Sequence, residues 1–264
     1  MTSRTRDAEA RMSFLEHLDE LRRRLMVSAL ALLGGFLVAF AFVGRLFDIV
    51  MKPLTEALPP GGTLIFTEPT EGFLLTLKIA ALAGVLIAAP VVMWQLWLFI
   101  APGLYTNERR MAIPFVLMST VFFVGGALFS HYMVFPWAWR FFASFSNDYV
   151  DFMPRIAPAF ALYAKLMLAM GAVFQMPTLV LFLSRMGVVT ARMLIRQTKY
   201  AILVIFIVAA VLTPGPDVVS QVLMAAPMIV LYGISIVIAW LFGRRPRPDE
   251  DPATGRRSAA DPKN

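Results

Sequence analysis

The sequence predicts an all-α, polytopic membrane protein whose six transmembrane helices are bent into a concave bundle, with both termini in the cytoplasm. Composition is the first reason: 59% of the 264 residues are hydrophobic, 16% are charged, and the mean hydropathy is +0.71. Soluble domains carry about 45–50% apolar and about 25% charged residues. The second reason is that the apolar residues gather in runs long enough to cross a bilayer, which takes roughly 20 residues per helix.

The six expected spans are long stretches without a charged residue. The first lacks the small-residue cleavage pattern that follows a signal peptide, so we expect it to be retained. The fifth is short, because residues 200–213 would form only about 21 Å of helix against a hydrocarbon core of about 30 Å. We therefore expect it to thin the bilayer or to use polar flanks. The spans cover residues 25–43, 79–107, 111–139, 166–184, 200–216 and 218–243.

The spans divide the chain into three parts. Residues 1–24 form a cytoplasmic arm that begins an amphipathic helix, residues 25–243 form the transmembrane domain, and residues 244–264 form a disordered cytoplasmic tail. Proline removes a backbone hydrogen bond and bends a helix, so prolines in the apolar runs predict the concave shape. They are Pro90, Pro114, Pro136, Pro177 and Pro227.

The Lys and Arg residues indicate the orientation. Most of the 24 lie in the N-terminal arm, in the loops after the second and fourth spans, and in the tail. The positive-inside rule then places both termini in the cytoplasm of a cell that holds this protein in its plasma membrane. The basic surface suits anionic lipid, and we expect no nucleic acid as a partner. The other side carries only Arg45, Lys52, Arg140 and Arg155.

The stretch FLEHLDELRRRL, residues 14–25, places acidic residues directly before the first span. Ser13 and Glu16 fit a capping box, so we expect a helix to begin at Ser13. Glu20 and Arg24 are spaced as an i,i+4 ion pair, which is one sufficient explanation for the carboxylate. The other explanation is that the carboxylate receives a ligand.

A second carboxylate, Glu108, is the one acidic residue in the loop APGLYTNERR, residues 101–110. It could simply interact with the helix dipole at the start of the third span. It also lies on the same side of the membrane as Glu20. Two carboxylates on a basic surface suit a ligand with paired guanidinium groups, because Arg makes planar two-point contacts to carboxylates that Lys cannot make.

These segments resemble the TatC family, the core subunit of the twin-arginine protein translocase. The resemblance covers roughly residues 12–243, and its most specific part is WQLWLFIAPGLYTNERR at residues 94–110. It implies six helices, recognition of Arg-Arg signal peptides on folded cargo, and proton-motive-force-driven export. It also implies assembly with single-span TatA- or TatB-type subunits and with further copies of the same chain. Other matching segments are FLEHLDELRRRL, KPL at 52–54, VFPWAW at 134–139, GAVFQMP at 171–177 and LTPGPDVVSQ at 212–221.

The resemblance assigns roles to particular residues. It places signal-peptide recognition on Glu20 and Glu108, supported by Phe99, Leu104 and Tyr105. It marks Pro53 in the first external loop and, in an external turn, Asp217 and Gln221 as functional. At Gln175, inside the fourth span, many members carry Glu, whereas glutamine cannot titrate. The Gln175 amide either contacts a partner helix or makes a hydrogen bond within the bundle.

The remaining polar residues in the spans point to no chemistry. Lys78 and Lys165 lie near span ends, where their side chains can extend to the interface. His17 and His131 are too isolated to bind a metal, the chain has no cysteine, and no nucleophile lies beside a base. We therefore expect no catalytic residue, metal or cofactor, and no enzyme. A secondary transporter of solutes or ions is the alternative, but it would need polar groups near the midplane of the bilayer.

Overall fold

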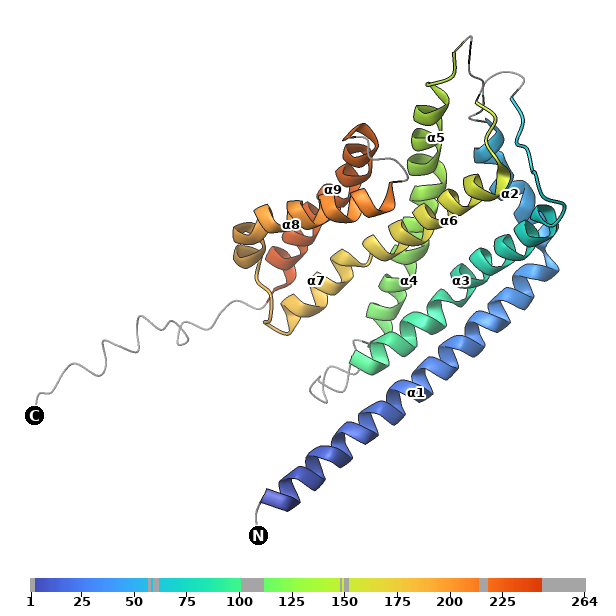
Figure 1. The fold of residues 1–264 in the computed structure, drawn as a ribbon. Helices are drawn as coiled ribbons and strands as arrows, with labels where there is room; N and C mark the ends of the chain where they lie inside the picture. The colour runs from blue at the N-terminus through green and yellow to red at the C-terminus, as the bar shows by residue number, and fades with distance from the viewer. Residues whose placement is uncertain are drawn as a thin grey trace, which may run out of the picture.

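A computed structural model describes residues 3–56, 58, 62–100, 112–147, 149, 152–213 and 218–243. Most of these residues form helices (Figure 1). The helices are α1 (Ser3–Ala41), α2 (Val43–Glu56), α3 (Glu71–Ile100), α4 (Ala112–Phe129), the π-helix η3 (Ser130–Val134), α5 (Phe135–Ala143), α6 (Ile156–Val173), α7 (Met176–Arg185), α8 (Ala191–Leu212) and α9 (Val218–Phe242).

The six predicted spans are confirmed, with changes at their ends. Six helical segments of the described chain are long and apolar enough to cross a membrane. The fifth is not short, because α8 continues through a polar stretch back to Ala191, where the Thr190 side chain caps it by accepting from the Met193 amide. Its 22 residues reach about 33 Å. The six segments are His17–Ala41, Glu71–Phe99, Ile113–Ala143, Ile156–Arg185, Ala191–Leu212 and Val218–Phe242.

The first helix begins earlier than the capping box predicts. α1 starts at Ser3, so Ser13 lies inside the helix and does not begin it. The segment before Ser13 contains Ala, Glu, Arg and Met and no Gly or Pro. These residues favour helix, which explains why the helix extends past the predicted cap.

The fourth span begins at Ile156, ten residues before the predicted start, and is broken in its middle. α6 ends at Val173 and α7 begins at Met176, with Pro177 in the first turn of α7. Pro177 has no amide hydrogen for the preceding turn, which accounts for the break. The earlier start places Lys165 well inside α6 rather than at its end. The Lys165 ammonium donates to the carbonyl of Val211 in α8.

The third span also bends beside a proline. η3 lies between α4 and α5, and Pro136 is the second residue of α5. Single π turns inside α-helices are rare and mark local irregularity. Pro136 and Pro177 thus mark irregularities in their spans, whereas Pro90 and Pro227 lie inside the uninterrupted helices α3 and α9.

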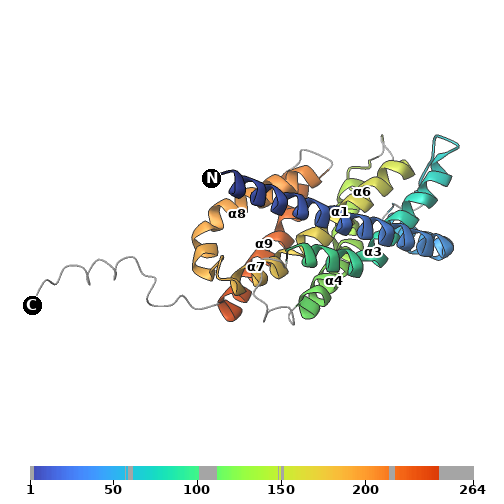
Figure 2. The same ribbon diagram turned by 90° about the horizontal axis from the view of Figure 1, so that it is seen from below.

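The α1 and α3 helices lie side by side along most of their length (Figures 1 and 2). They approach closely at two glycines, where an added Cβ on Gly35 would lie 2.5 Å from the carbonyl oxygen of Gly84. Small residues allow helix backbones in membranes to approach this closely. We call the end of this pair where α1 begins and α3 ends the basic side, because most Lys and Arg residues fall there in the sequence.

The opposite side is held together by contacts between its loops. The first of these loops contains a helix, α2, that the sequence analysis did not predict. The Trp139 indole in α5 donates to the carbonyl of Leu54 in α2 at 3.1 Å. Further along, the Ile156 amide donates to the carbonyl of Ile65 at 2.8 Å. Arg155 binds the buried carboxylate of Glu71 at 2.7 Å.

Candidate functional site

The Glu20 carboxylate lies on the basic side, at the contact between α1 and α3. Its Oε1 accepts from Nη2 of Arg24 at 2.9 Å, one helical turn further on. The predicted i,i+4 ion pair is thereby confirmed. The Arg24 guanidinium also reaches across to α3, where Nη1 donates to Oε1 of Gln95 at 3.3 Å. The carboxylate therefore belongs to a cluster that joins two helices, which its sequence spacing alone does not reveal.

Phe99 lies beside this cluster. Its ring stacks on the imidazole of His17, with centroids 4.8 Å apart and planes 26° apart. His17 lies one turn before Glu20 on α1, and Gln95 lies one turn before Phe99 on α3. The packing of the two helices thus brings Phe99 and Glu20 to one end of the α1–α3 pair. His17 and Gln95 were not among the predicted site residues. Gln95 lies four residues before the predicted Phe99, and this helical spacing could have indicated that the two share a face of α3.

Some predicted site residues fall outside the described part of the chain. They are Glu108, Leu104, Tyr105 and Asp217. In the sequence, the first three belong to the segment that joins α3 to α4. Their roles stay predictions.

Gln175 lies at the break between α6 and α7, and its amide is engaged within the bundle. Nε2 donates to the carbonyl of Ser119 in α4 at 2.8 Å. The Ser119 hydroxyl accepts from the Trp97 indole of α3 at 2.9 Å. The hydrogen bond within the bundle, one of two predicted roles for Gln175, is therefore present. The side chain of Gln175 is partly exposed.

Pro53 and Gln221 both act in packing between helices. Pro53 is buried within α2, next to the Leu54 carbonyl that binds Trp139. Gln221 in α9 donates through Nε2 to the carbonyl of Phe206 in α8 at 2.9 Å. Among the described residues, no hydrogen bond or ion pair joins Glu20 to Pro53 or Gln221.

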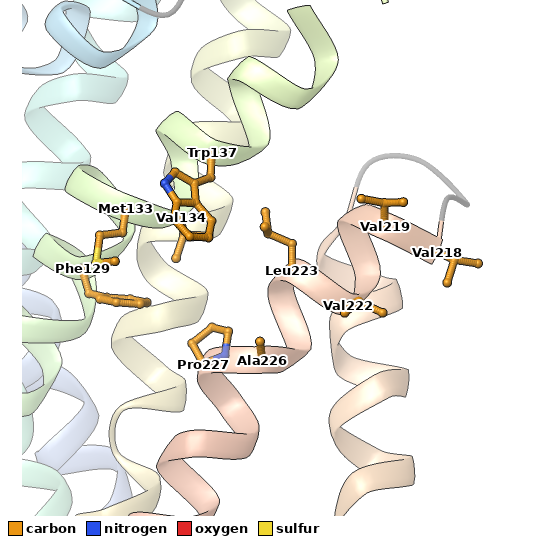
Figure 3. A pocket seen from close by; sticks show the side chains of 10 residues that line it. All are labelled: Phe129, Met133, Val134, Trp137, Val218, Val219, Val222, Leu223, Ala226 and Pro227. Carbon is orange, nitrogen blue, oxygen red and sulfur yellow. The ribbon is translucent and has the colours of Figure 1, made fainter. Parts of the chain in front are cut away.

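An apolar groove opens between the third and sixth spans (Figure 3). In this view Met133, Trp137 and Leu223 point into the space between the two spans. Its volume is about 480 Å³, and no charged side chain is among the residues that line it. Such a surface can accept hydrocarbon or an apolar helix, but it cannot bind guanidinium groups. The lining residues are Phe129, Met133, Val134, Trp137, Val218, Val219, Val222, Leu223, Ala226 and Pro227.

The second histidine, His131, has a hydrogen-bonding partner. His131 in η3 is buried, and its Nδ1 lies 2.8 Å from the hydroxyl of the buried Tyr163 in α6. A buried polar group normally has such a partner. Within the described ranges, no three His, Asp or Glu side chains come together in a group that could hold a metal ion.

Comparison with known proteins agrees with the geometry of the bundle. Residues 16–227 match the family model of the Sec-independent protein translocase protein TatC. The chain is 43% identical over 245 residues to the TatC protein of Desulforapulum autotrophicum, covering 93% of this chain and 90% of that protein. It is also 43% identical over 235 residues to TatC of Helicobacter pylori strain J99, covering 89% and 92%.

Solved structures show the same arrangement of helices. A crystal structure described as the twin arginine translocase receptor TatC is 37% identical and superposes with a TM-score of 0.73, covering 84% of this chain and 97% of that one. A second structure of that receptor, in the detergent DDM, gives a TM-score of 0.76 at the same identity, covering 84% and 99%. The family match, the identities and the common fold extend over most of the chain. The chain therefore belongs to the TatC family of Sec-independent protein translocase proteins.

Proposed function

We propose that this TatC chain receives the paired arginines of a signal peptide at Glu20 and Glu108 on its basic side, which faces the cytoplasm. As a TatC protein it is a component of the twin-arginine translocase and not an enzyme. Both termini are then cytoplasmic, and the chain resides in the plasma membrane as a concave bundle. The patch formed by Glu20, Gln95 and Phe99 supports this proposal.

The observation that carries the proposal is the position of the Glu20 carboxylate. Only Oε1 accepts from Arg24, so Oε2 has no protein donor among the described residues. The side chain is 31% exposed, which leaves it open to a ligand. Glu108 lies in the segment that follows α3, the helix that carries Gln95 and Phe99. Two carboxylates can each accept a planar guanidinium group.

The partner subunits belong to the same proposal. Cargo would be folded proteins that carry twin-arginine signal peptides, and proton-motive force would drive their export. The single-span TatA- or TatB-type subunits would contact the concave face near Gln175. Further copies of the chain would join the complex. The partial exposure of the Gln175 side chain supports this contact, because polar side chains promote association between helices in membranes.

Peptide affinity of the purified protein tests the site. Glu20→Gln keeps the shape of the side chain and removes its charge. A charge-assisted hydrogen bond contributes about 1.5–3 kcal/mol, and less at a wet surface. Each lost carboxylate should therefore lower the affinity for a twin-Arg peptide by about tenfold. Glu108→Lys adds repulsion and should weaken binding more than Glu108→Gln.

Asp19→Asn is the matched control, since Asp19 is an exposed acid beside Glu20. It should leave the affinity nearly unchanged. A twin-Lys peptide should bind weakly to every variant. If Glu20→Gln and Glu108→Lys both bind the twin-Arg peptide as tightly as the parent protein, the carboxylates only stabilise helices and the proposed recognition is wrong.

A further inference from the structure

We infer that a pocket between the beginnings of α3 and α6 binds the headgroup of a phospholipid that carries both a phosphate and a primary ammonium group. The pocket lies on the side opposite to the basic side and has a volume of about 310 Å³. Four of its lining side chains are charged, and the others are apolar. The pocket is separate from the patch around Glu20, so it does not depend on the proposed peptide recognition. The charged residues are Glu68, Glu71, Lys78 and Arg155.

Lys78 lies at the depth of lipid headgroups. Residues 79–100 of α3 carry no charge and extend about 33 Å, which matches a hydrocarbon core of about 30 Å. Lys78 directly precedes this uncharged stretch. Its ammonium group can therefore reach the phosphate layer of the leaflet on that side of the membrane.

The Lys78 ammonium group has no protein acceptor within the described ranges. The residue is exposed, and neither an ion pair nor a hydrogen bond joins it to another described residue. An unpaired charge beside hydrocarbon is costly. A phosphate group of the adjacent leaflet would lower this cost, because basic pockets between membrane helices attract lipid headgroups.

Arg155 offers a second cation to the same phosphate. Its Nη2 atom binds Oε1 of Glu71 at 2.7 Å and lies 3.9 Å from Oε1 of Glu68. Among the described residues, neither Nη1 nor Nε of Arg155 makes a hydrogen bond. The side chain is 46% exposed, so these nitrogens remain open to a phosphate oxygen, and guanidinium groups bind phosphate well.

The two carboxylates decide which headgroup fits. The two cations balance Glu68 and Glu71, so a headgroup with a net negative charge would leave the site with an excess of negative charge. A zwitterionic headgroup keeps the balance and brings a cation for a carboxylate. Glu68 is open to that cation, because its side chain is 67% exposed, whereas Glu71 is buried against Arg155. A primary ammonium group can donate hydrogen bonds to Glu68, and a trimethylammonium group cannot.

The apolar part of the lining favours a lipid over a soluble phosphate compound. Leu74 of α3 and Pro158 and Ala161 of α6 line the pocket and are exposed. An acyl chain attached to the headgroup can lie against these residues and keep them from water, which is favourable. A soluble headgroup without acyl chains would leave them uncovered and should bind more weakly.

Native mass spectrometry of the delipidated full chain in detergent tests the choice of headgroup. Phosphatidylethanolamine should bind about threefold to tenfold more tightly than phosphatidylcholine or phosphatidylglycerol with the same acyl chains, because it alone satisfies both the cations and Glu68. Glycerophosphoethanolamine, which lacks acyl chains, should not compete at an equal concentration. Equal affinities for the three lipids, or competition by the soluble compound, would overturn the inference.

Lys78→Gln tests the phosphate contact. It removes the unpaired cation and should lower the affinity for phosphatidylethanolamine by about tenfold. Lys52→Gln is the matched control, because Lys52 is an exposed lysine on the same side whose ammonium group lies 3.8 Å from Glu56, outside the pocket. It should leave the affinity unchanged. Unchanged binding in Lys78→Gln, or the same loss in Lys52→Gln, would show that Lys78 binds no phosphate.

Glu68→Gln tests the ammonium contact independently. The variant should lower the affinity for phosphatidylethanolamine and raise that for phosphatidylglycerol, since one negative charge of the lining is gone. The preference between the two lipids should therefore narrow or reverse. A parallel change for both lipids would overturn the role of Glu68. Thermal unfolding verifies that each variant folds, and Glu68→Gln decides the inference if Lys78→Gln does not fold.

Discussion

The side chain of Gln175 donates a 2.8 Å hydrogen bond to the backbone carbonyl of Ser119. This bond joins the break between α6 and α7 to α4. An amide without a hydrogen-bond partner in an apolar environment costs free energy, and this bond provides an acceptor for the Gln175 amide. An ionised carboxylate at this position could not donate this hydrogen bond.

Gln175→Met should lower the free energy of unfolding modestly. Methionine has a similar length and no donor, so the variant loses one hydrogen bond between helices, worth about 0.6–2 kcal/mol. Denaturant unfolding in detergent measures the change. Peptide affinity should stay the same, because no contact of Gln175 involves Glu20. A tenfold loss of peptide affinity would show that Gln175 contributes to recognition.

A photo-crosslinker at position 175 should capture a single-span partner helix when the partner subunits are present. The proposal places their contact at this partly exposed amide, where a polar group favours a packed neighbour over lipid. Mass spectrometry of the crosslinked product identifies the neighbour. Capture of lipid alone, in membranes that contain the partners, would count against this surface.

Gly35→Ala should destabilise the protein and disturb the peptide site. The new Cβ would lie 2.5 Å from the carbonyl oxygen of Gly84, so α1 and α3 must separate, at a cost of about 1–3 kcal/mol. Gly34→Ala is the control, since a Cβ there meets no atom within 4 Å. Thermal unfolding compares the two variants, and equal unfolding temperatures would mean that the close approach is not needed.

Glu71→Gln should loosen the loops on the side opposite to the basic side. Its buried carboxylate binds Arg155 at 2.7 Å and also accepts from the Thr67 amide at 3.2 Å. Glu68→Gln is the comparison, because the exposed Glu68 lies 3.9 Å from the same arginine. Limited proteolysis should cut the loops faster in Glu71→Gln than in Glu68→Gln. The same rate in both variants would contradict the importance of the buried pair.

Single-cysteine labelling should determine the orientation in the membrane, and the absence of native cysteine simplifies it. Cysteines at the exposed Thr63 and Asn147 should react with an impermeant reagent from outside the cell. A cysteine at the exposed Val188 should react only after the membrane is opened. Labelling of position 188 from outside would contradict the proposed orientation.

The sequence predicts well those features that depend on neighbours along the chain. The six spans follow from the lengths of apolar runs, and the Glu20–Arg24 pair follows from the helical repeat, which places residues four apart on one face. The prolines at 136 and 177 correctly mark interruptions. The helix ends were predicted less well, because α1 and α8 both extend into polar stretches that carry no breaker.

The tertiary structure alone decided which segments meet. Nothing in the local pattern pairs Arg24 with Gln95 or His17 with Phe99, since each pair depends on the distance and rotation between α1 and α3. That distance is set by the contact of Gly35 with Gly84, two small residues far apart in the sequence. The α2 helix, with Pro53 inside it, is likewise joined to α5, where the Leu54 carbonyl accepts from the Trp139 indole. Such contacts come from the packing of whole helices, which a local sequence pattern does not contain.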